Sequence, residues 1–132
     1  MQKDFDKWNS LKKQIDAKDD KDRLFFRDGE VWWINIGLNI GFEVNGKDDQ
    51  FMRPVLILKK YNKYSFLALP LTTVKKKSPY NVFLSIIDNK KSYANLSQLR
   101  NIDSKRLINK AGHIEIGILK EIREKVSQIN FG

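Results

Sequence analysis

The side chains that could carry out chemistry in this sequence are of few types. The chain has no cysteine and a single histidine, His113. Thiol nucleophiles, disulfide bonds and the usual zinc sites, which combine several Cys and His ligands, are therefore excluded. Any reaction must depend on other groups, such as guanidinium, carboxylate or hydroxyl.

One long segment is a natural place for such groups. Residues 37–53 carry glycines at positions 37, 41 and 46 and separate two stretches rich in branched and aromatic residues. Loops longer than about a dozen residues in a compact domain are usually functional or disordered. The segment is therefore a candidate site before any relative is considered.

The charge of the chain points to a polyanionic partner. Lysine and arginine total 25 against 16 acidic residues, which gives a net charge of +9. Most of the excess lies in residues 29–132, which hold 17 basic and 9 acidic groups. Such a field favours nucleic acid or an acidic protein, although a high lysine content also serves solubility alone. The run Lys75, Lys76 and Lys77 belongs to a polar segment that we expect to form a basic loop.

The first 28 residues form a separate part of the chain. Phe5, Trp8, Leu11 and Ile15 recur at helical spacing and predict an amphipathic helix, and the polar run 16–22 predicts a linker. We therefore divide the chain into a helical extension with its linker, residues 1–28, and one domain, residues 29–132. No apolar stretch is long enough to span a membrane and the start lacks a secretory signal, so we expect a cytoplasmic protein.

Residues 29–132 have the residue pattern of a small β protein. Branched and aromatic runs predict strands over 31–36, 55–60, 64–69, 82–87 and 93–96, with a turn at 88–91, an irregular or single-turn helical crossing near 102–107 and a helix over 118–129. Five or six short strands and one terminal helix are typical of a small, partly open barrel. The fold class expected is mainly β with helices.

Three segments, read in order, resemble the MazF/PemK toxins. The first is 29–34, followed by the glycine loop and 53–58. The second is 68–73, with the sequence ALPLTT. The third is 97–107, with the sequence SQLRNIDSKRL, followed by Gly112 and His113. Each piece is weak alone, but their order and spacing together make the match specific.

The resemblance implies an SH3-like barrel that dimerises, cleaves single-stranded RNA such as mRNA at short, selected sequences without metal or other cofactor, and is restrained by an acidic antitoxin. The family's catalytic arginine and threonine fall on Arg53 and Thr72, and the acidic residue of its loop falls on Glu43. A guanidinium can stabilise charge on a phosphate, whereas its high pKa makes it a poor base. Glu43 could accept the 2′-hydroxyl proton. Thr73 competes with Thr72, because adjacent strand residues face opposite sides of a sheet.

Further RNA contacts follow from the same resemblance. We expect them from Gln98, from Phe42 by base stacking, and from Lys75 to Lys77 through phosphate. The sequence departs from the family by placing Phe42 where serine is usual and by lengthening the connection over 47–52. Both changes bear on sequence preference. His113 is taken as structural.

Several alternatives stay open on the sequence. The chain could be a noncatalytic RNA-binding barrel, or a toxin like CcdB, a barrel of similar architecture that traps DNA gyrase. The apolar stripe of the extension could cap the barrel or bind another chain. Of Trp32 and Trp33, which alternate across a strand, one should be core and the other could meet a partner.

Overall fold

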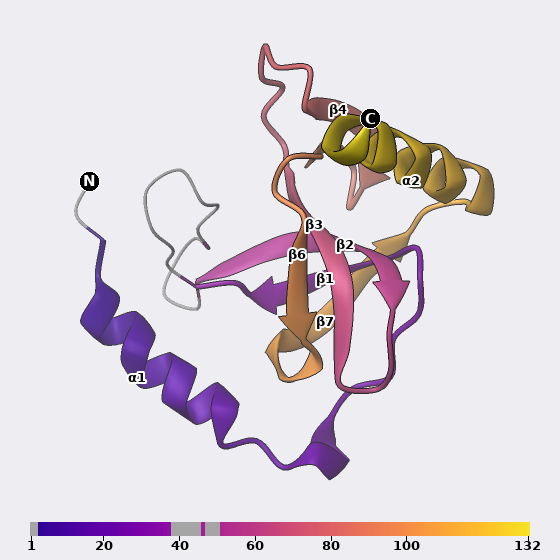
Figure 1. Cartoon of the computed structure of the whole chain (residues 1–132). Coiled ribbons are helices and arrows are strands. Elements are labelled where there is room, and N and C mark those ends of the chain that lie inside the picture. The colour runs from indigo at the N-terminus through magenta and orange to yellow at the C-terminus, as the bar shows by residue number, and fades with distance from the viewer. Residues whose placement is uncertain (1–2, 38–45, 47–50) are drawn as a thin grey trace.

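A computed structural model describes residues 3–37, 46 and 51–132 (Figure 1). Phe42 and Glu43 lie outside the described residues. The elements are α1 (Phe5–Asp16), η1 (Asp20–Asp22), β1 (Glu30–Asn35), β2 (Met52–Lys60), β3 (Ser65–Thr72), β4 (Asn81–Ile87), β5 (Lys90–Asn95), β6 (Arg100–Asp103), η2 (Ser104–Arg106), β7 (Leu107–His113) and α2 (Ile116–Phe131). The expected fold class, a mainly β half-barrel with a helix near each end of the chain, is confirmed. No described helix has the length and apolar character needed to cross a membrane.

The strands form one curled antiparallel sheet in the order β4-β5-β3-β2-β1-β7, with β6 also paired to β3. Along one edge of β3, residues 65–68 pair with β6 and residues 71–72 pair with β5. Pro70 lies between the two pairings. Because proline has no amide hydrogen to donate, it fits the point where β3 leaves one neighbour and joins the next. Thr72 therefore ends β3 in the second half of the sheet.

Apolar side chains pack on both faces of the sheet. Alternate residues of β2 point to opposite sides, so Leu56 and Leu58 join the cluster under α2 whereas Val55 and Ile57 join the cluster around Phe66. The helix α2 covers the first cluster with a stripe of buried residues, namely Leu119, Ile122 and Val126. Each such side chain contributes about 1.5–3 kcal/mol when fully buried.

Two strands were not anticipated. The segment 102–107, expected to be irregular or a single helical turn, does contain the single turn η2, but β6 precedes this turn and β7 follows it, and β7 pairs with β1 from Glu30 to Ile34. The predicted turn at 88–91 is shorter, because only Asp88 and Asn89 have left-handed φ angles, of 51° and 63°, and β5 already begins at Lys90. Trp32 is buried and Trp33 is half-buried.

The extension helix α1 packs on the barrel of its own chain, at the opposite end of the molecule from α2 (Figure 1). Trp8 and Ile15 are buried together with Phe51, whereas Phe5 is 48% exposed. The Trp8 ring meets Phe51 edge-on, with ring centroids 5.5 Å apart, and the Arg106 guanidinium lies 5.6 Å from the Trp8 ring centroid. Of the two roles open to the stripe, the structure shows the capping role.

Trp8 also lies directly on Gly37. This glycine has a φ of +82°, and a Cβ atom there would come within 2.1 Å of the Trp8 ring. The Gly37 amide donates a 3.1 Å hydrogen bond to the Phe51 carbonyl. One indole therefore packs on both Gly37 and Phe51, the second of which precedes Arg53 by two residues.

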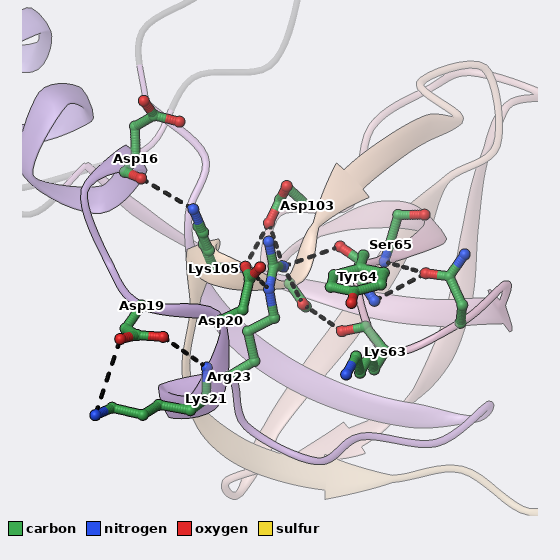
Figure 2. Close-up of polar contacts among 12 residues, drawn as sticks. Asp16, Asp19, Asp20, Lys21, Arg23, Lys63, Tyr64, Ser65, Asp103 and Lys105 are labelled. Carbon is green, nitrogen blue, oxygen red and sulfur yellow. Dashed lines mark hydrogen bonds and ion pairs between the residues drawn. The ribbon is translucent and has the colours of Figure 1, made fainter.

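The linker is held by Arg23, whose side chain is only 8% exposed (Figure 2). Its Nη1 donates to Asp103 Oδ1 at 2.7 Å, to Ser104 Oγ at 2.6 Å and to the Tyr64 carbonyl at 3.2 Å, and its Nε donates to Asp20 Oδ1 at 2.9 Å. Burial, the largest single effect, would raise the pKa of Asp103, but the hydrogen bonds from Arg23 and from the Lys105 amide, together with the charges of both residues, outweigh it and the pKa is lowered. The linker is thus fastened to the turn after β6.

Candidate functional site

Arg53 and Thr72 are brought together by the pairing of β2 with β3. The register pairs Ile57 with Ala68 and Val55 with Pro70. Two residues further along the same register, Arg53 comes opposite Thr72, and opposed residues of an antiparallel pair project to one face of the sheet. In agreement, Arg53 Nη1 donates a 3.2 Å hydrogen bond to the carbonyl of Leu71. Two residues distant in sequence thus become neighbours.

The surroundings of Arg53 suit a group that must bind an anion. It is half-buried on β2, with Ile34 of β1 opposite it on the other side. Burial lowers the pKa of the Arg53 guanidinium, which nevertheless stays charged near neutral pH. A guanidinium carries five N–H donors in a planar fork, and this geometry matches two oxygens of one phosphate.

The hydroxyl partner is better supplied by Thr72 than by Thr73. Thr72 is the last residue of β3 and is half-buried, whereas Thr73 is exposed and follows the strand. The Thr72 Oγ1 accepts a 3.2 Å hydrogen bond from the Val74 amide. Because the oxygen is the acceptor there, the hydroxyl proton can point toward an incoming phosphate oxygen. The register, continued two residues beyond the pair of Val55 with Pro70, sets Thr72 opposite Arg53, and the assignment of the active hydroxyl to Thr72 stays a prediction.

The remaining expected contacts lie at different places. Gln98 is half-buried in the connection between β5 and β6, two strands that pair with the same edge of β3. Its backbone amide donates a hydrogen bond to the Asn95 carbonyl at 3.2 Å. Lys75, Lys76 and Lys77 are exposed and follow Thr72 by three to five residues in the connection to β4. The Lys76 amide donates to Asn81 Oδ1 at 3.2 Å. The three lysines are close to Thr72 in sequence, and their contacts with RNA stay a prediction.

The expected general base is outside the part of the chain that the structure describes. Neither Glu43 nor Phe42 is placed, so their roles also stay predictions. Within residues 3–37, 46 and 51–132, no three His, Cys, Asp or Glu side chains gather as a metal site would require. His113 ends β7 opposite Glu30, four residues along β1 from the row of Arg53, or about 13 Å at ~3.3 Å per residue.

A cavity of about 660 Å³ opens between the linker and the barrel. Its walls include Arg23, Asn35, Met52 and Lys105. Neither Arg53 nor Thr72 lines it, although Met52 is the chain neighbour of Arg53. The paired side chains therefore lie elsewhere on the sheet, and this cavity is not their site.

Two aromatic residues that the sequence did not single out lie beside Thr72. The register pairs Thr72 with Tyr93 of β5, and Tyr93 with Phe83 of β4. The rings of Phe83 and Tyr93 meet edge-on, with centroids 5.8 Å apart. Both residues alternate with buried residues along their strands, and this pattern places them on the outward face. Nothing in the sequence indicates that β5 pairs with β3 at Thr72.

Comparison with known proteins identifies the family and the fold of this chain. Residues 27–130 match the model of the PemK-like, MazF-like toxins of type II toxin–antitoxin systems. No curated protein matches the sequence. Among solved structures, a MazF from Deinococcus radiodurans is 25% identical, with a TM-score of 0.66, and the match covers 80% of this chain and 97% of that one.

Two further structures share the fold at lower identity. One is a MazE–MazF complex from Deinococcus radiodurans, 22% identical with a TM-score of 0.61, in which the match covers 80% of this chain and 96% of that one. The other is an endoribonuclease in complex with its cognate antitoxin from a mycobacterial species, 16% identical with a TM-score of 0.61, covering 82% and 98%. Because the family model spans most of the chain, this protein belongs to the PemK-like, MazF-like toxins of type II toxin–antitoxin systems.

Proposed function

We propose that this toxin is an endoribonuclease that cleaves single-stranded RNA, including mRNA, through the ribose 2′-hydroxyl and without a metal ion. The proposal is supported by the register of β2 with β3, which pairs Val55 with Pro70 and, continued by two residues, sets Arg53 opposite Thr72, and by the hydrogen bond from Arg53 Nη1 to the Leu71 carbonyl. A guanidinium and a hydroxyl on one face can contact the same phosphate. The net charge of +9 favours a polyanionic substrate in addition.

The reaction forms one bond and breaks one. The 2′-oxygen attacks the adjacent phosphorus and gives its proton to a base, for which Glu43 is the candidate. Negative charge grows on the two non-bridging oxygens, where Arg53 and Thr72 donate hydrogen bonds. The bond from phosphorus to the 5′-oxygen then breaks, and that oxygen takes up a proton. The products are a 2′,3′-cyclic phosphate and a 5′-hydroxyl.

Arg53 fits the role of charge stabiliser and acid better than that of base. A guanidinium is protonated at neutral pH, so it can donate a proton but cannot accept one. Because burial lowers its pKa, the Arg53 side chain releases a proton to the leaving 5′-oxygen more readily than a solvated arginine does. Glu43 returns the 2′-hydroxyl proton to water, and Arg53 recovers one from water, so the site is restored.

The rest of the molecule holds the substrate and the partners. Lys75 to Lys77 contact phosphates, Gln98 contacts a base or sugar, and Phe42 stacks on a base. The toxin acts in the cytoplasm as a dimer of identical chains. An acidic antitoxin covers the site and the exposed lysines 75–77 and blocks RNA, by analogy with the relatives solved as MazE–MazF and endoribonuclease–antitoxin complexes.

The test is cleavage of a mixed RNA pool by purified protein in excess EDTA. The wild type should produce fragments with 5′-hydroxyl ends, and Arg53→Ala should lower the cleavage rate by about 100- to 1000-fold, the usual effect of losing one donor to a developing oxyanion. Arg27→Ala is the matched control, since Arg27 is an exposed arginine that lies 5.2 Å from the Phe25 ring.

Three outcomes would contradict the proposal. Cleavage that appears only when Mg²⁺ is restored would exclude the metal-free route. RNA that is bound but never cut would favour a noncatalytic RNA-binding barrel. Trapping of a DNA gyrase cleavage complex by both the wild type and Arg53→Ala would favour a toxin that acts as CcdB does.

A further inference from the structure

The outer face of β4 and β5 carries an aromatic pair that the proposed reaction does not use. Phe83 is 53% exposed and Tyr93 is half-buried beside it, with the two rings edge-on at 5.8 Å between centroids. The two ring planes are inclined by 72°, so Tyr93 supports the Phe83 ring from its edge and the exposed Phe83 ring offers an apolar face to solvent. Such a face is a stacking surface for another flat ring.

The aromatic pair lies in one row with the candidate catalytic residues. Phe83 pairs with Tyr93, Tyr93 pairs with Thr72, and the register of β2 with β3 continues the row to Arg53. Residues directly opposite one another in antiparallel strands project to the same face. Neighbouring strands lie about 4.8 Å apart, so the Phe83 strand is only about 10 Å from the strand of Thr72. A nucleotide next to the scissile phosphate can span this interval.

Positive charge borders the aromatic face. The connection from Thr72 to β4 carries the exposed Lys75, Lys76 and Lys77, and Lys91 lies exposed two residues before Tyr93 on the same side of β5. Flat apolar rings next to lysines are complementary to a chain of bases joined by phosphates. A second copy of this +9 chain would instead bring like charges together at this face.

We propose that Phe83 and Tyr93 form a subsite that stacks an unpaired nucleobase adjacent to the scissile phosphate. The proposal rests on the ribonuclease function proposed above and adds to it where the neighbouring nucleotide binds. Stacking on an aromatic face is tolerant of base identity, so the subsite adds affinity and register more than it adds sequence preference.

The binding test uses the Arg53→Ala protein and a short, mixed-sequence, single-stranded RNA with a fluorescent label. Adding Phe83→Ala should raise Kd by roughly 5- to 100-fold, the range for losing one stacked base. Phe83→Trp should keep the affinity and Phe83→Leu should lose most of it, because a leucine is apolar but has no flat face. Phe25→Ala is the matched control, since Phe25 is 68% exposed and packs against Lys60 and Arg27 instead.

A second arm identifies the base. RNAs with one abasic nucleotide at successive positions should show a single position at which the effect of Phe83→Ala disappears, because protein ring and base are then removed from the same contact. An unchanged Kd for both Phe83→Ala and Phe83→Leu would overturn the subsite. Dissociation of a dimer by Phe83→Ala, with RNA affinity per chain unchanged, would assign the face to a second copy and overturn it as well.

The two proposals fail separately. Wild-type protein that cleaves RNA normally while Phe83 variants bind as before rejects the subsite alone. Wild-type protein that never cleaves RNA, but whose affinity falls with Phe83→Ala in the abasic-dependent manner, rejects the nuclease and supports the stacking surface. Thermal unfolding of each variant accompanies the binding data, and the exposed position of Phe83 predicts little change in Tm.

Discussion

Replacing Trp8 with alanine should release the extension helix from the barrel. Trp8 is 6% exposed, packs on Phe51 and Gly37, and lies under the Arg106 guanidinium. Apart from Ile15 it is the only fully buried side chain of α1 among the described residues. The helix has 12 residues, and helices of that length are marginal in water without tertiary contacts.

The magnitude follows from the contacts that would be lost. Truncating a well-packed tryptophan to alanine costs about 3–5 kcal/mol in protein cores, a figure that already includes contacts such as the edge-on pair with Phe51, worth about 0.5–1.5 kcal/mol. What remains of the docked contacts is Ile15, worth about 1.5–3 kcal/mol, the half-buried Leu11, and the exposed hydrogen bond from Lys105 Nζ to the Asp16 carbonyl at 2.9 Å. The loss is as large as the contribution that is left, so α1 should be mostly undocked.

Hydrogen exchange of the backbone amides in residues 5–16 measures this directly. Protection in α1 should fall by about 100-fold or more in Trp8→Ala, since ~3 kcal/mol corresponds to more than two powers of ten. Phe5→Ala is the matched control, because Phe5 belongs to the same stripe but is 48% exposed. Its α1 protection should stay near the wild-type value.

Unchanged protection of residues 5–16 in Trp8→Ala would refute the reasoning, because the docking of α1 would then depend on something other than this indole. Equal loss of protection in Phe5→Ala would refute it too, since the exposed and buried positions of the stripe would count alike. Protection that falls throughout the barrel core would indicate that α1 is an integral part of the domain.

Two further predictions follow from the site and the linker. Thr72→Val should slow RNA cleavage by roughly 100-fold, whereas Thr73→Val should leave the rate within about a factor of two, as measured by gel-resolved single-turnover kinetics; the reverse order would move the active hydroxyl to Thr73. The pKa of Asp103 is lowered in the folded protein because its contacts with Arg23 and Lys105 together outweigh burial, so these contacts stabilise the fold above the unfolded pKa of about 3.9 and the contribution is lost as pH falls through the lower folded pKa. The difference in unfolding free energy between wild type and Asp103→Asn should thus be constant from neutral pH to about pH 5 and shrink below pH 4; a difference that grows in acid would contradict the assignment.

The sequence was sufficient for elements whose apolar pattern is strong. The stripe Leu119, Ile122 and Val126 predicts α2, and the branched runs predict the hairpin of β2 and β3, because periodicity reports directly on which face is buried. β7 was missed because Leu107–His113 alternates poorly, with buried, exposed and half-buried residues in no regular order. It is a strand because β1 needs a backbone partner along its second edge, and a tertiary requirement of this kind leaves no local signal.

The candidate site, like the fold, could be predicted from the sequence only in part. Arg53 and Thr72 could be singled out from the resemblance to the family, but their opposition depends on the register of β2 with β3. The neighbourhood of Phe83 and Tyr93 to Thr72 depends on β3 changing partner at Pro70, which no local pattern reveals. The docking of α1 likewise depends on the backbone at Gly37 and Phe51, both with positive φ.

The central claim is that Arg53 and Thr72 act on one phosphate, and a double-mutant cycle of single-turnover cleavage rates tests it most directly. The account predicts that Arg53→Ala and Thr72→Val each slow cleavage in EDTA, and that the double variant is far less impaired than the product of the two single effects, because both donors serve the same oxyanion. Full multiplication of the two effects would place the residues in independent roles. Wild-type cleavage by Arg53→Ala would contradict the account outright.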